Sequence, residues 1–282
     1  MSPSLAPCQL FEPRSLRGAL KLLRDEGPLV PVAGCTDVYA AASAGILAAR
    51  RFLSLWNLKT LARIDTTRAG TIRIGALATF AQLIRSPILQ QRLPMLVAAA
   101  RQIGGPQIRN RGTIGGNVAS GSPAGDTLPV LAAAEAQVAL LSAAGERRVP
   151  FVGFYTGYRQ SVLRPDEIIG GFEIPPIEGR QWFRKVGSRA ALTISKVVVA
   201  GIRTTEKPRI ALGSVAATVV RAPRTEAALA AGATAAEAMP ILASEITPVD
   251  DLRSTAEYRR RVAMNLLGRF WKDTEDDRGQ RT

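Results

Sequence analysis

The sequence contains no histidine and only two cysteines, Cys8 and Cys35. Without an imidazole, the chain cannot build a Ser-His-Asp triad or a histidine metal site, and it cannot use histidine as a general acid or base. Two thiols are too few for a four-cysteine zinc site or for the ligands of an iron–sulfur cluster. If the chain belongs to an enzyme, a cofactor or the carboxylate, lysine and tyrosine side chains must supply the chemistry.

Long apolar runs are also missing. No stretch of about 18 residues is free of charge and apolar enough for a transmembrane helix. The first 12 residues are interrupted by Pro3 and Pro7 and lack the apolar segment of a secretory signal. We therefore expect a cytoplasmic protein with no transmembrane segment.

The charge is strongly basic, with 37 Lys and Arg against 23 Asp and Glu among 282 residues, a net charge of +14. Such a charge attracts nucleic acid, an anionic membrane, an acidic protein or a phosphorylated cofactor. The basic residues are spread along the chain, and no RNA-binding pattern of interleaved aromatics accompanies them. We expect a basic surface or a subunit interface, and no nucleic-acid partner.

The composition, 46% hydrophobic and 21% charged, is that of a globular protein, and the length suggests about two domains. In the first part, helical and alternating patterns succeed each other, and residues 137–141 and 147–149 pair as a hairpin. After the Pro-Pro pair at 175–176, three strand-like runs (181–186, 194–203 and 209–216) precede helical patterns at 224–242 and 255–272. A sheet followed by helices indicates a separate α+β domain.

Two glycine turns each precede a helical pattern, at residues 33–37 and 112–117. A glycine turn that opens a helix exposes backbone N–H groups at the positive helix end, which is an anion site. Each turn alone is more simply a tight turn. Neither matches G-x-G-x-x-G or the P-loop, so the patterns do not support Rossmann dinucleotide binding or Walker-type hydrolysis.

Residues 32–37, Val-Ala-Gly-Cys-Thr-Asp, and residues 113–117, Thr-Ile-Gly-Gly-Asn, together carry a family resemblance. They resemble the paired FAD-diphosphate motifs of the flavin (medium) subunits of molybdenum hydroxylases, the carbon monoxide dehydrogenase and xanthine dehydrogenase type. Residues 119–126 resemble the family's run to an FAD-contacting Asp, and residues 183–197 resemble its segment with a lysine near the flavin. The four segments occur in the family's order, and the resemblance covers nearly the whole chain.

The resemblance implies an α+β fold in two parts. Residues 1–175 would form a two-lobed FAD-binding domain of the vanillyl-alcohol-oxidase (PCMH) type. Residues 176–282 would form a small α+β domain with a three-stranded antiparallel sheet and a helical bundle.

The same resemblance assigns the site residues, all of them to FAD binding, with no catalytic residue and no metal ligand on this chain. Two segments would hold the diphosphate, Asp126 would receive a hydroxyl or amine of FAD, Ile103 would make an apolar contact, and Lys185 would lie near the isoalloxazine. The residues of the two diphosphate segments are Pro31, Val32, Ala33, Gly34, Cys35, Thr36, Asp37, Val38, Thr113, Ile114, Gly115, Gly116 and Asn117.

The implied activity is electron transfer. A large partner subunit with a molybdenum cofactor would hydroxylate the substrate, and a small partner subunit with [2Fe–2S] clusters would relay the electrons. FAD on this chain would collect them and pass them to NAD, a quinone, oxygen or another acceptor. The scarcity of cysteine fits, because the clusters then lie on another chain. The complex would be a dimer of heterotrimers.

The sequence departs from the family pattern at two places. Cys35 stands where Gly or Asn is usual, so a positive φ there would strain the backbone; we expect a buried small residue rather than a reactive thiol. The loop after Lys185, at 189–193, lacks the acidic residue that the family often has.

Two other functions stay open at this point. One is a standalone FAD-dependent oxidoreductase of the same fold, resembling bacterial cell-wall precursor reductases. The other is a basic, non-enzymatic protein that binds nucleic acid or a protein partner. Flavin absorbance excludes the second, and co-purifying molybdenum and iron exclude the first.

Overall fold

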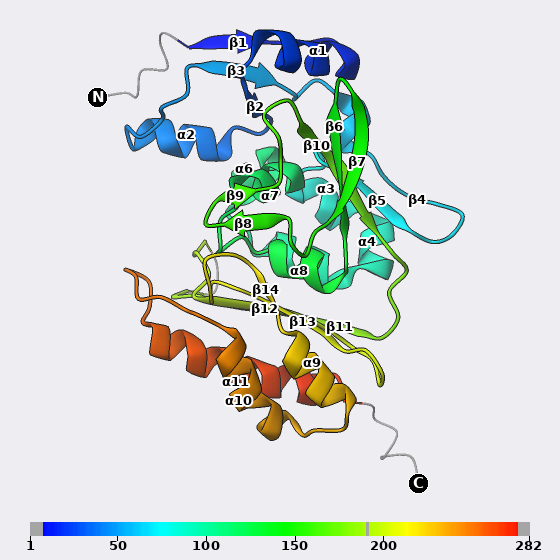
Figure 1. The fold of residues 1–282 in the computed structure, drawn as a ribbon, viewed down its shortest axis with the longest axis vertical. Coiled ribbons are helices and arrows are strands. Elements are labelled where there is room, and N and C mark those ends of the chain that lie inside the picture. Colours follow the sequence, from blue (N-terminus) through cyan, green and yellow to red (C-terminus); the bar gives the residue numbers. More distant parts are fainter. Residues whose placement is uncertain (1–7, 190–191, 276–282) are drawn as a thin grey trace.

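The computed structural model describes residues 8–189 and 192–275. Figure 1 shows three layers from top to bottom, which follow each other along the chain. The upper layer is a small parallel sheet in the order β1-β3-β2 with two helices. Its elements are β1 (Gln9–Phe11), α1 (Leu16–Glu26), β2 (Val30–Val32), α2 (Thr36–Ser43) and β3 (Arg51–Ser54).

The middle layer is an antiparallel sheet in the order β4-β5-β10-β6-β7. Its strands are β4 (Ile64–Thr66), β5 (Ile72–Gly75), β6 (Gln137–Ser142), β7 (Gly145–Pro150) and β10 (Ile168–Ile174). A separate hairpin consists of β8 (Tyr155–Gly157) and β9 (Gln160–Ser161). The expected hairpin between residues 137 and 149 is confirmed as β6 and β7.

Short helices pack with this sheet, and prolines explain several of their boundaries. The helical elements are η1 (Lys59–Ala62), α3 (Phe80–Arg85), α4 (Pro87–Arg92), α5 (Pro94–Arg101), α6 (Pro106–Arg111), α7 (Ile114–Ser120) and α8 (Leu128–Ala133). Pro87, Pro94 and Pro106 each occupy the first turn of a helix, where the missing N–H costs no hydrogen bond. Each of these prolines begins a new helix, so residues 80–111 form several short helices.

The lower layer is an antiparallel sheet in the order β11-β12-β13-β14. Its elements are β11 (Arg180–Val186), β12 (Val197–Arg203), β13 (Arg209–Gly213), β14 (Val220–Arg221), α9 (Pro223–Ala230), α10 (Ala235–Glu245) and α11 (Ala256–Asp273). The sheet has a short fourth strand, β14, in addition to the three expected. The pattern at 224–242 forms two helices, because the chain turns at Gly232, whose φ is +94°.

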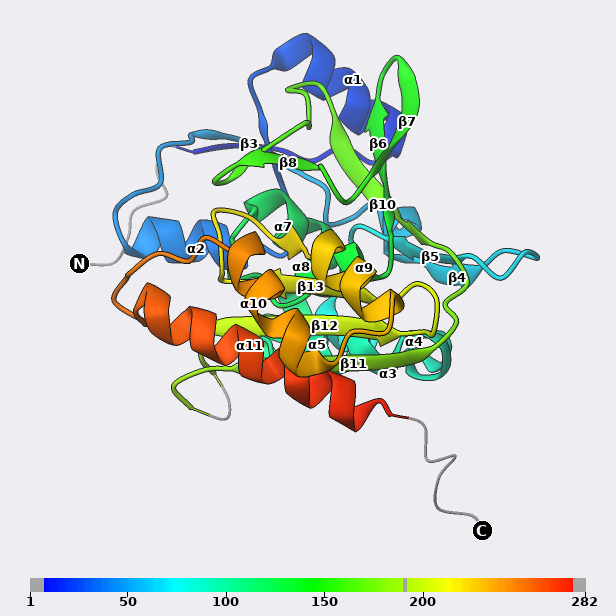
Figure 2. The ribbon, with the colours of Figure 1, turned by 60° about the horizontal axis from the view of Figure 1, so that its bottom comes forward.

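The strand β12 is buried on both faces, and this explains its uninterrupted apolar sequence. Val197 and Val199 pack with α9–α11, whereas Ala200 and Ile202 belong to the core of the middle layer. Figure 2 shows α10 and α11 in front of this sheet, and α8 contacts the strands β12 and β13. One face of the lower sheet therefore packs against the middle layer, and the other packs against α9–α11.

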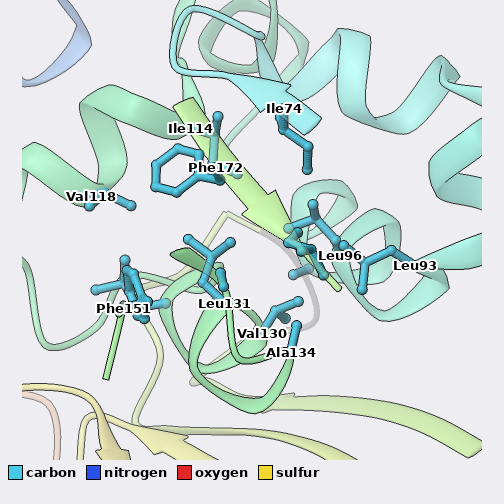
Figure 3. Packing of buried hydrophobic residues seen from close by; sticks show 14 of the residues in the cluster. Ile74, Leu93, Leu96, Ile114, Val118, Val130, Leu131, Ala134, Phe151 and Phe172 are labelled. Carbon is cyan, nitrogen blue, oxygen red and sulfur yellow. The ribbon is translucent and has the colours of Figure 1, made fainter. Parts of the chain in front are cut away.

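The main core lies between the middle sheet and its helices. Figure 3 shows Phe172 of β10 beside Ile114 of α7, with Leu131 of α8 and Phe151 close by.

Residues 175–179 connect β10 to β11, and we propose residue 175 as the domain boundary. Among the described residues, no helix is long and apolar enough to cross a membrane.

Candidate functional site

The two glycine turns lie against each other. A Cβ atom on Gly34 would lie 1.8 Å from the backbone oxygen of Arg111 and 3.0 Å from the nitrogen of Gly112. Only glycine permits this approach. Ser120, at the end of α7, also donates a hydrogen bond to the Asp37 carboxylate in α2. The structure thus places the segments 33–37 and 112–117 side by side.

The first turn places Cys35 at the N-cap of α2 with a φ of +58°. The strained backbone expected for this cysteine is confirmed, because non-glycine residues rarely adopt this region. Its side chain does not cap the helix, so within residues 8–189 and 192–275 the first-turn N–H groups of Thr36 and Asp37 have no capping side chain. These N–H groups at a positive helix end can receive an anion.

Cys35 is exposed in the chain alone, so our expectation of a buried residue at this position was wrong. The protein atoms around the sulfur shield it in part from water and thereby raise the pKa of the thiol, and the nearby Arg111 guanidinium lowers it by a smaller amount. The net direction favours the protonated thiol, so nothing marks Cys35 as a reactive nucleophile.

The two adjacent glycines of the second turn have different surroundings. Gly115 is buried, its N–H donates to the carbonyl of Ala76 at 2.8 Å, and a Cβ atom would lie 2.6 Å from the Ala76 methyl. Gly116 is exposed, and a Cβ atom there would meet only the Thr113 hydroxyl, at 3.0 Å, among the residues that the structure describes. That hydroxyl caps α7 by accepting the Gly116 N–H at 3.1 Å. Gly115 therefore serves internal packing, and Gly116 is the glycine open to a ligand.

Asp126 and Lys185 form a buried ion pair. The carboxylate oxygen Oδ2 lies 2.6 Å from Nζ, and the side chains are 7% and 5% exposed. Lys185 reaches this position from β11 and also donates to the carbonyl of Gln102 at 3.3 Å. Burial raises the pKa of Asp126 to about 6, although the Lys185 ammonium and its hydrogen bond act in the opposite direction.

The second oxygen of Asp126, Oδ1, is buried and has no hydrogen-bond partner within the described chain. A buried carboxylate oxygen without a donor is costly, so an unpaired oxygen of this kind calls for an explanation. It fits a ligand that brings its own hydroxyl or amine donor.

One further contact joins the ion pair to the glycine turns. Thr127, next to Asp126, donates to the Asn117 side-chain oxygen at 2.6 Å. The expected residue Ile103 follows Gln102, whose carbonyl receives Lys185, and it is half-buried against the main core. The second turn is thereby joined to the ion pair through Thr127, and the ion pair is joined to the segment that holds Ile103 through Gln102.

Comparison with known proteins decides the family. The profile described as "FAD binding domain in molybdopterin dehydrogenase" matches residues 6–177, and that described as "CO dehydrogenase flavoprotein C-terminal domain" matches residues 180–274. The chain belongs to this family of FAD-binding subunits. The resemblance inferred from the motifs is confirmed, and with it FAD as the cofactor of this chain and its place among oxidoreductase subunits.

Individual relatives agree. The carbon monoxide dehydrogenase medium chain of Hydrogenophaga pseudoflava is 35% identical over 209 residues, 71% of this chain and 73% of that one. A putative xanthine dehydrogenase FAD-binding subunit of Escherichia coli is 39% identical over 162 residues, 57% of this chain and 56% of that one. A solved carbon monoxide dehydrogenase chain from H. pseudoflava superposes with a TM-score of 0.89 at 29% identity, covering 95% and 96% of the two chains. The expected α+β fold is confirmed.

Several residues assigned to the FAD-binding segments serve the fold through their side chains. Val32 is buried within the upper layer, and Ile114 is fully buried in the main core, as Figure 3 shows. Only the backbone of these residues can reach a ligand, and the Ile114 N–H already donates to Ala78. Pro31 lies exposed in β2, and Val38 is half-buried in α2.

Sequence reasoning missed Arg111 in this FAD-binding subunit. Its guanidinium stacks on the Trp56 ring with 3.9 Å between the guanidinium carbon and the ring centroid, and Lys59 lies 5.7 Å from the same centroid. Arg111 also acts on the Cys35 thiol, so it adds positive charge at the paired turns. The Arg-Asn-Arg run at 109–111 is the local sign of this charge in the sequence.

The loop expected to lack negative charge is described in part. Arg189 donates to the carbonyl of Leu192 at 2.9 Å, and Leu192 has a φ of +53°. Ala190 and Ala191 lie outside the described residues.

Proposed function

We propose that this chain is the FAD-carrying electron-transfer subunit of a molybdenum-containing hydroxylase or dehydrogenase complex. It would take electrons from [2Fe–2S] clusters of a small partner subunit and pass them to an external acceptor such as NAD, a quinone or oxygen. A large partner subunit would carry the molybdenum cofactor and bind the substrate. The observation that carries the proposal is the paired glycine turns linked to a buried Asp126–Lys185 pair with one unsatisfied oxygen.

The paired turns would hold the FAD diphosphate through residues 31–38 and 113–117. The uncapped N–H groups of Thr36 and Asp37 offer hydrogen-bond donors at a positive helix end. Gly34 lets the two turns lie against each other, and Gly116 leaves the second turn without a side chain where a ligand must come close. Arg111 adds a fixed positive charge, which the stack on Trp56 holds in place.

Asp126 and Lys185 would receive the other polar groups. The Asp126 Oδ1 atom can accept a hydrogen bond from a hydroxyl or amine of FAD, because at pH 7 a carboxyl with a pKa of about 6 is mainly ionised. Lys185 would lie near the isoalloxazine, with Ile103 in apolar contact. FAD supplies the electron-accepting and electron-releasing chemistry when it is bound, and the protein orients it.

Partners are part of the proposal because the chain cannot hold iron–sulfur clusters with two cysteines. The names of its relatives support a medium subunit, since they include a carbon monoxide dehydrogenase medium chain and a nicotine 6-hydroxylase medium subunit. We extend the proposal to a dimer of heterotrimers, which sedimentation of the complex would test. We also propose that the complex lies in the cytoplasm, which cell fractionation would test.

A pair of equivalent glycine substitutions tests the site. Gly116 in α7 and Gly18 in α1 both donate their N–H to a capping hydroxyl at 3.1 Å, from Thr113 and Ser15 respectively. A Cβ atom would meet that hydroxyl at 3.0 Å in one case and 3.2 Å in the other. Gly116→Val should give folded protein without FAD, whereas Gly18→Val should keep its FAD. Full flavin occupancy in Gly116→Val would refute the assignment of the turn.

A further inference from the structure

Two buried serines at the ends of neighbouring strands hold the loop that carries Asp126. Ser195, just before β12, is fully buried, and its Oγ donates to the carbonyl of Ala124 at 3.2 Å. Ser214, just after β13, donates its backbone N–H to the carbonyl of Pro123 at 2.8 Å. The two serine Oγ atoms lie 2.9 Å apart. The loop is thus fixed at two consecutive carbonyls shortly before the carboxylate.

Arg259 of α11 locks these two serines together. Its buried guanidinium donates through Nη1 to the carbonyls of Ser214 at 2.8 Å and Lys196 at 3.1 Å. Its Nη2 atom lies 2.6 Å from the Asp251 carboxylate. Ser214 has a φ of +64°, a conformation that a serine keeps only when its surroundings enforce it. Arg259 therefore fixes the backbone on both sides of the serine pair.

The same sheet also positions the partner of Asp126. Lys185 lies on β11 directly opposite Val198 of β12, and the Lys196 N–H donates to the carbonyl of Val186 at 2.8 Å. One end of the lower sheet thereby sets the Lys185 ammonium and, through the serines, the Asp126 loop. A change in the structure of this end of the sheet would therefore displace both Asp126 and Lys185.

We infer that Ser195, Ser214 and Arg259 form an interlayer clamp whose role is to position the Asp126 carboxylate for FAD. The inference rests on the proposed function, which puts Asp126 against the cofactor. The three are positioning residues, because they act on the loop backbone. The unpaired Asp126 Oδ1 atom can bind FAD only if it lies within hydrogen-bond distance of a donor of FAD. The clamp holds the loop so that the oxygen keeps this position.

A double-mutant cycle separates positioning from general stability. FAD is titrated into the deflavinated full-length chain, as wild type, Ser195→Ala, Asp126→Asn and the double variant. Loss of one positioning hydrogen bond should raise the Kd for FAD about fivefold. If Ser195 acts through Asp126, the same substitution in the Asp126→Asn background should change the Kd by less than about twofold.

Thr225→Ala is the matched control. Thr225 is a fully buried hydroxyl of the lower layer, which donates to the Glu245 carboxylate at 2.6 Å and joins α9 to α10. This control should lower the Tm and leave both the Kd and the visible circular dichroism of bound FAD unchanged. Ser195→Ala should alter both. If Ser195→Ala does not fold, Ser214→Ala, which keeps the backbone bond to Pro123, takes its place in the cycle.

The outcomes distinguish the two levels of the proposal. If Asp126→Asn weakens FAD binding and the cycle is additive, the clamp is only structural and this inference is wrong. If Asp126→Asn leaves the Kd unchanged, the proposed site itself is wrong and the clamp loses its role. Coupling at Ser195 together with an inert Thr225→Ala supports the inference.

Discussion

Replacement of Lys185 by methionine should lower the reduction potential of the bound flavin, and the size of the effect should depend on pH. Lys185 is neutralised by Asp126 at 2.6 Å, so the charge of the pair depends on the carboxyl, whose pKa burial raises to about 6. At pH 5 the carboxyl is mainly protonated and the pair carries a charge of about +1. At pH 7.5 it is ionised and the pair is neutral.

The variant changes these charges unequally. Without Lys185 the burial of Asp126 remains and both effects that lower its pKa disappear. A cation at this distance lowers a carboxyl pKa by roughly 1 to 3 units, so the carboxyl pKa in Lys185→Met rises above that of the wild type. At pH 5 the carboxyl is mainly protonated in both proteins, and the substitution removes about one positive charge. At pH 7.5 the substitution removes less charge, because the carboxyl is ionised in the wild type and more protonated in the variant.

The expected shift follows from the same scale. A nearby charge worth roughly 1 to 3 pKa units corresponds to about 1.4 to 4 kcal/mol, and about 1.4 kcal/mol equals about 30 mV for a two-electron couple. We expect Lys185→Met to lower the potential by roughly 30 to 90 mV at pH 5 and by a smaller amount at pH 7.5. Electrons should also arrive at FAD more slowly at pH 5.

Potentiometric titration at the two pH values checks this prediction. Arg184→Met is the control, because Arg184 is exposed on the opposite face of β11, where it acts on Asp273 of α11. It should change the potential little at either pH. A Lys185→Met protein that still binds FAD and shows the wild-type potential at pH 5 would refute the role of this lysine.

Two further predictions concern stability. Because burial raises the pKa of Asp126 from 3.8 to about 6, its contribution to stability is fully present below pH 4 and is lost as the pH rises through 6. The free energy of unfolding of the FAD-free wild type, measured with urea, should fall by about 3 kcal/mol relative to Asp126→Asn over this range; equal pH slopes would contradict the burial effect. Gly115→Val should cost about 3 kcal/mol by overpacking against Ala76, and a wild-type Tm would contradict that packing role.

The sequence predicted those parts of the fold and site that depend on local patterns. The glycine turns and the strands β11 and β13 follow from residues close together in the chain. The strained backbone at Cys35 followed from the family resemblance, in which Gly or Asn is usual at this position. The strand β14 was not predicted because two residues are too few to show an alternating pattern. The helix end at Gly232 was not predicted because this glycine lies inside an alanine-rich run.

The remaining features depend on contacts between distant residues. Asp126 and Lys185 are 59 positions apart, so no local spacing predicts that they neutralise each other. Gly115 and Gly116 have different roles because Ala76, which directly follows β5, packs against Gly115. It follows that substituting both glycines, as the sequence alone would suggest, confuses a packing defect with a binding defect.

The most direct test of the central claim, that this chain carries FAD for electron transfer within a complex, is to purify it through an affinity tag from cells that produce its partners. We expect FAD, iron and molybdenum to co-purify, and FAD alone to stay with this chain after the subunits are separated. The separated chain should not reduce a dye with any hydroxylatable heterocycle or aldehyde. Robust substrate-dependent dye reduction by the separated chain, without iron or molybdenum, would contradict the claim.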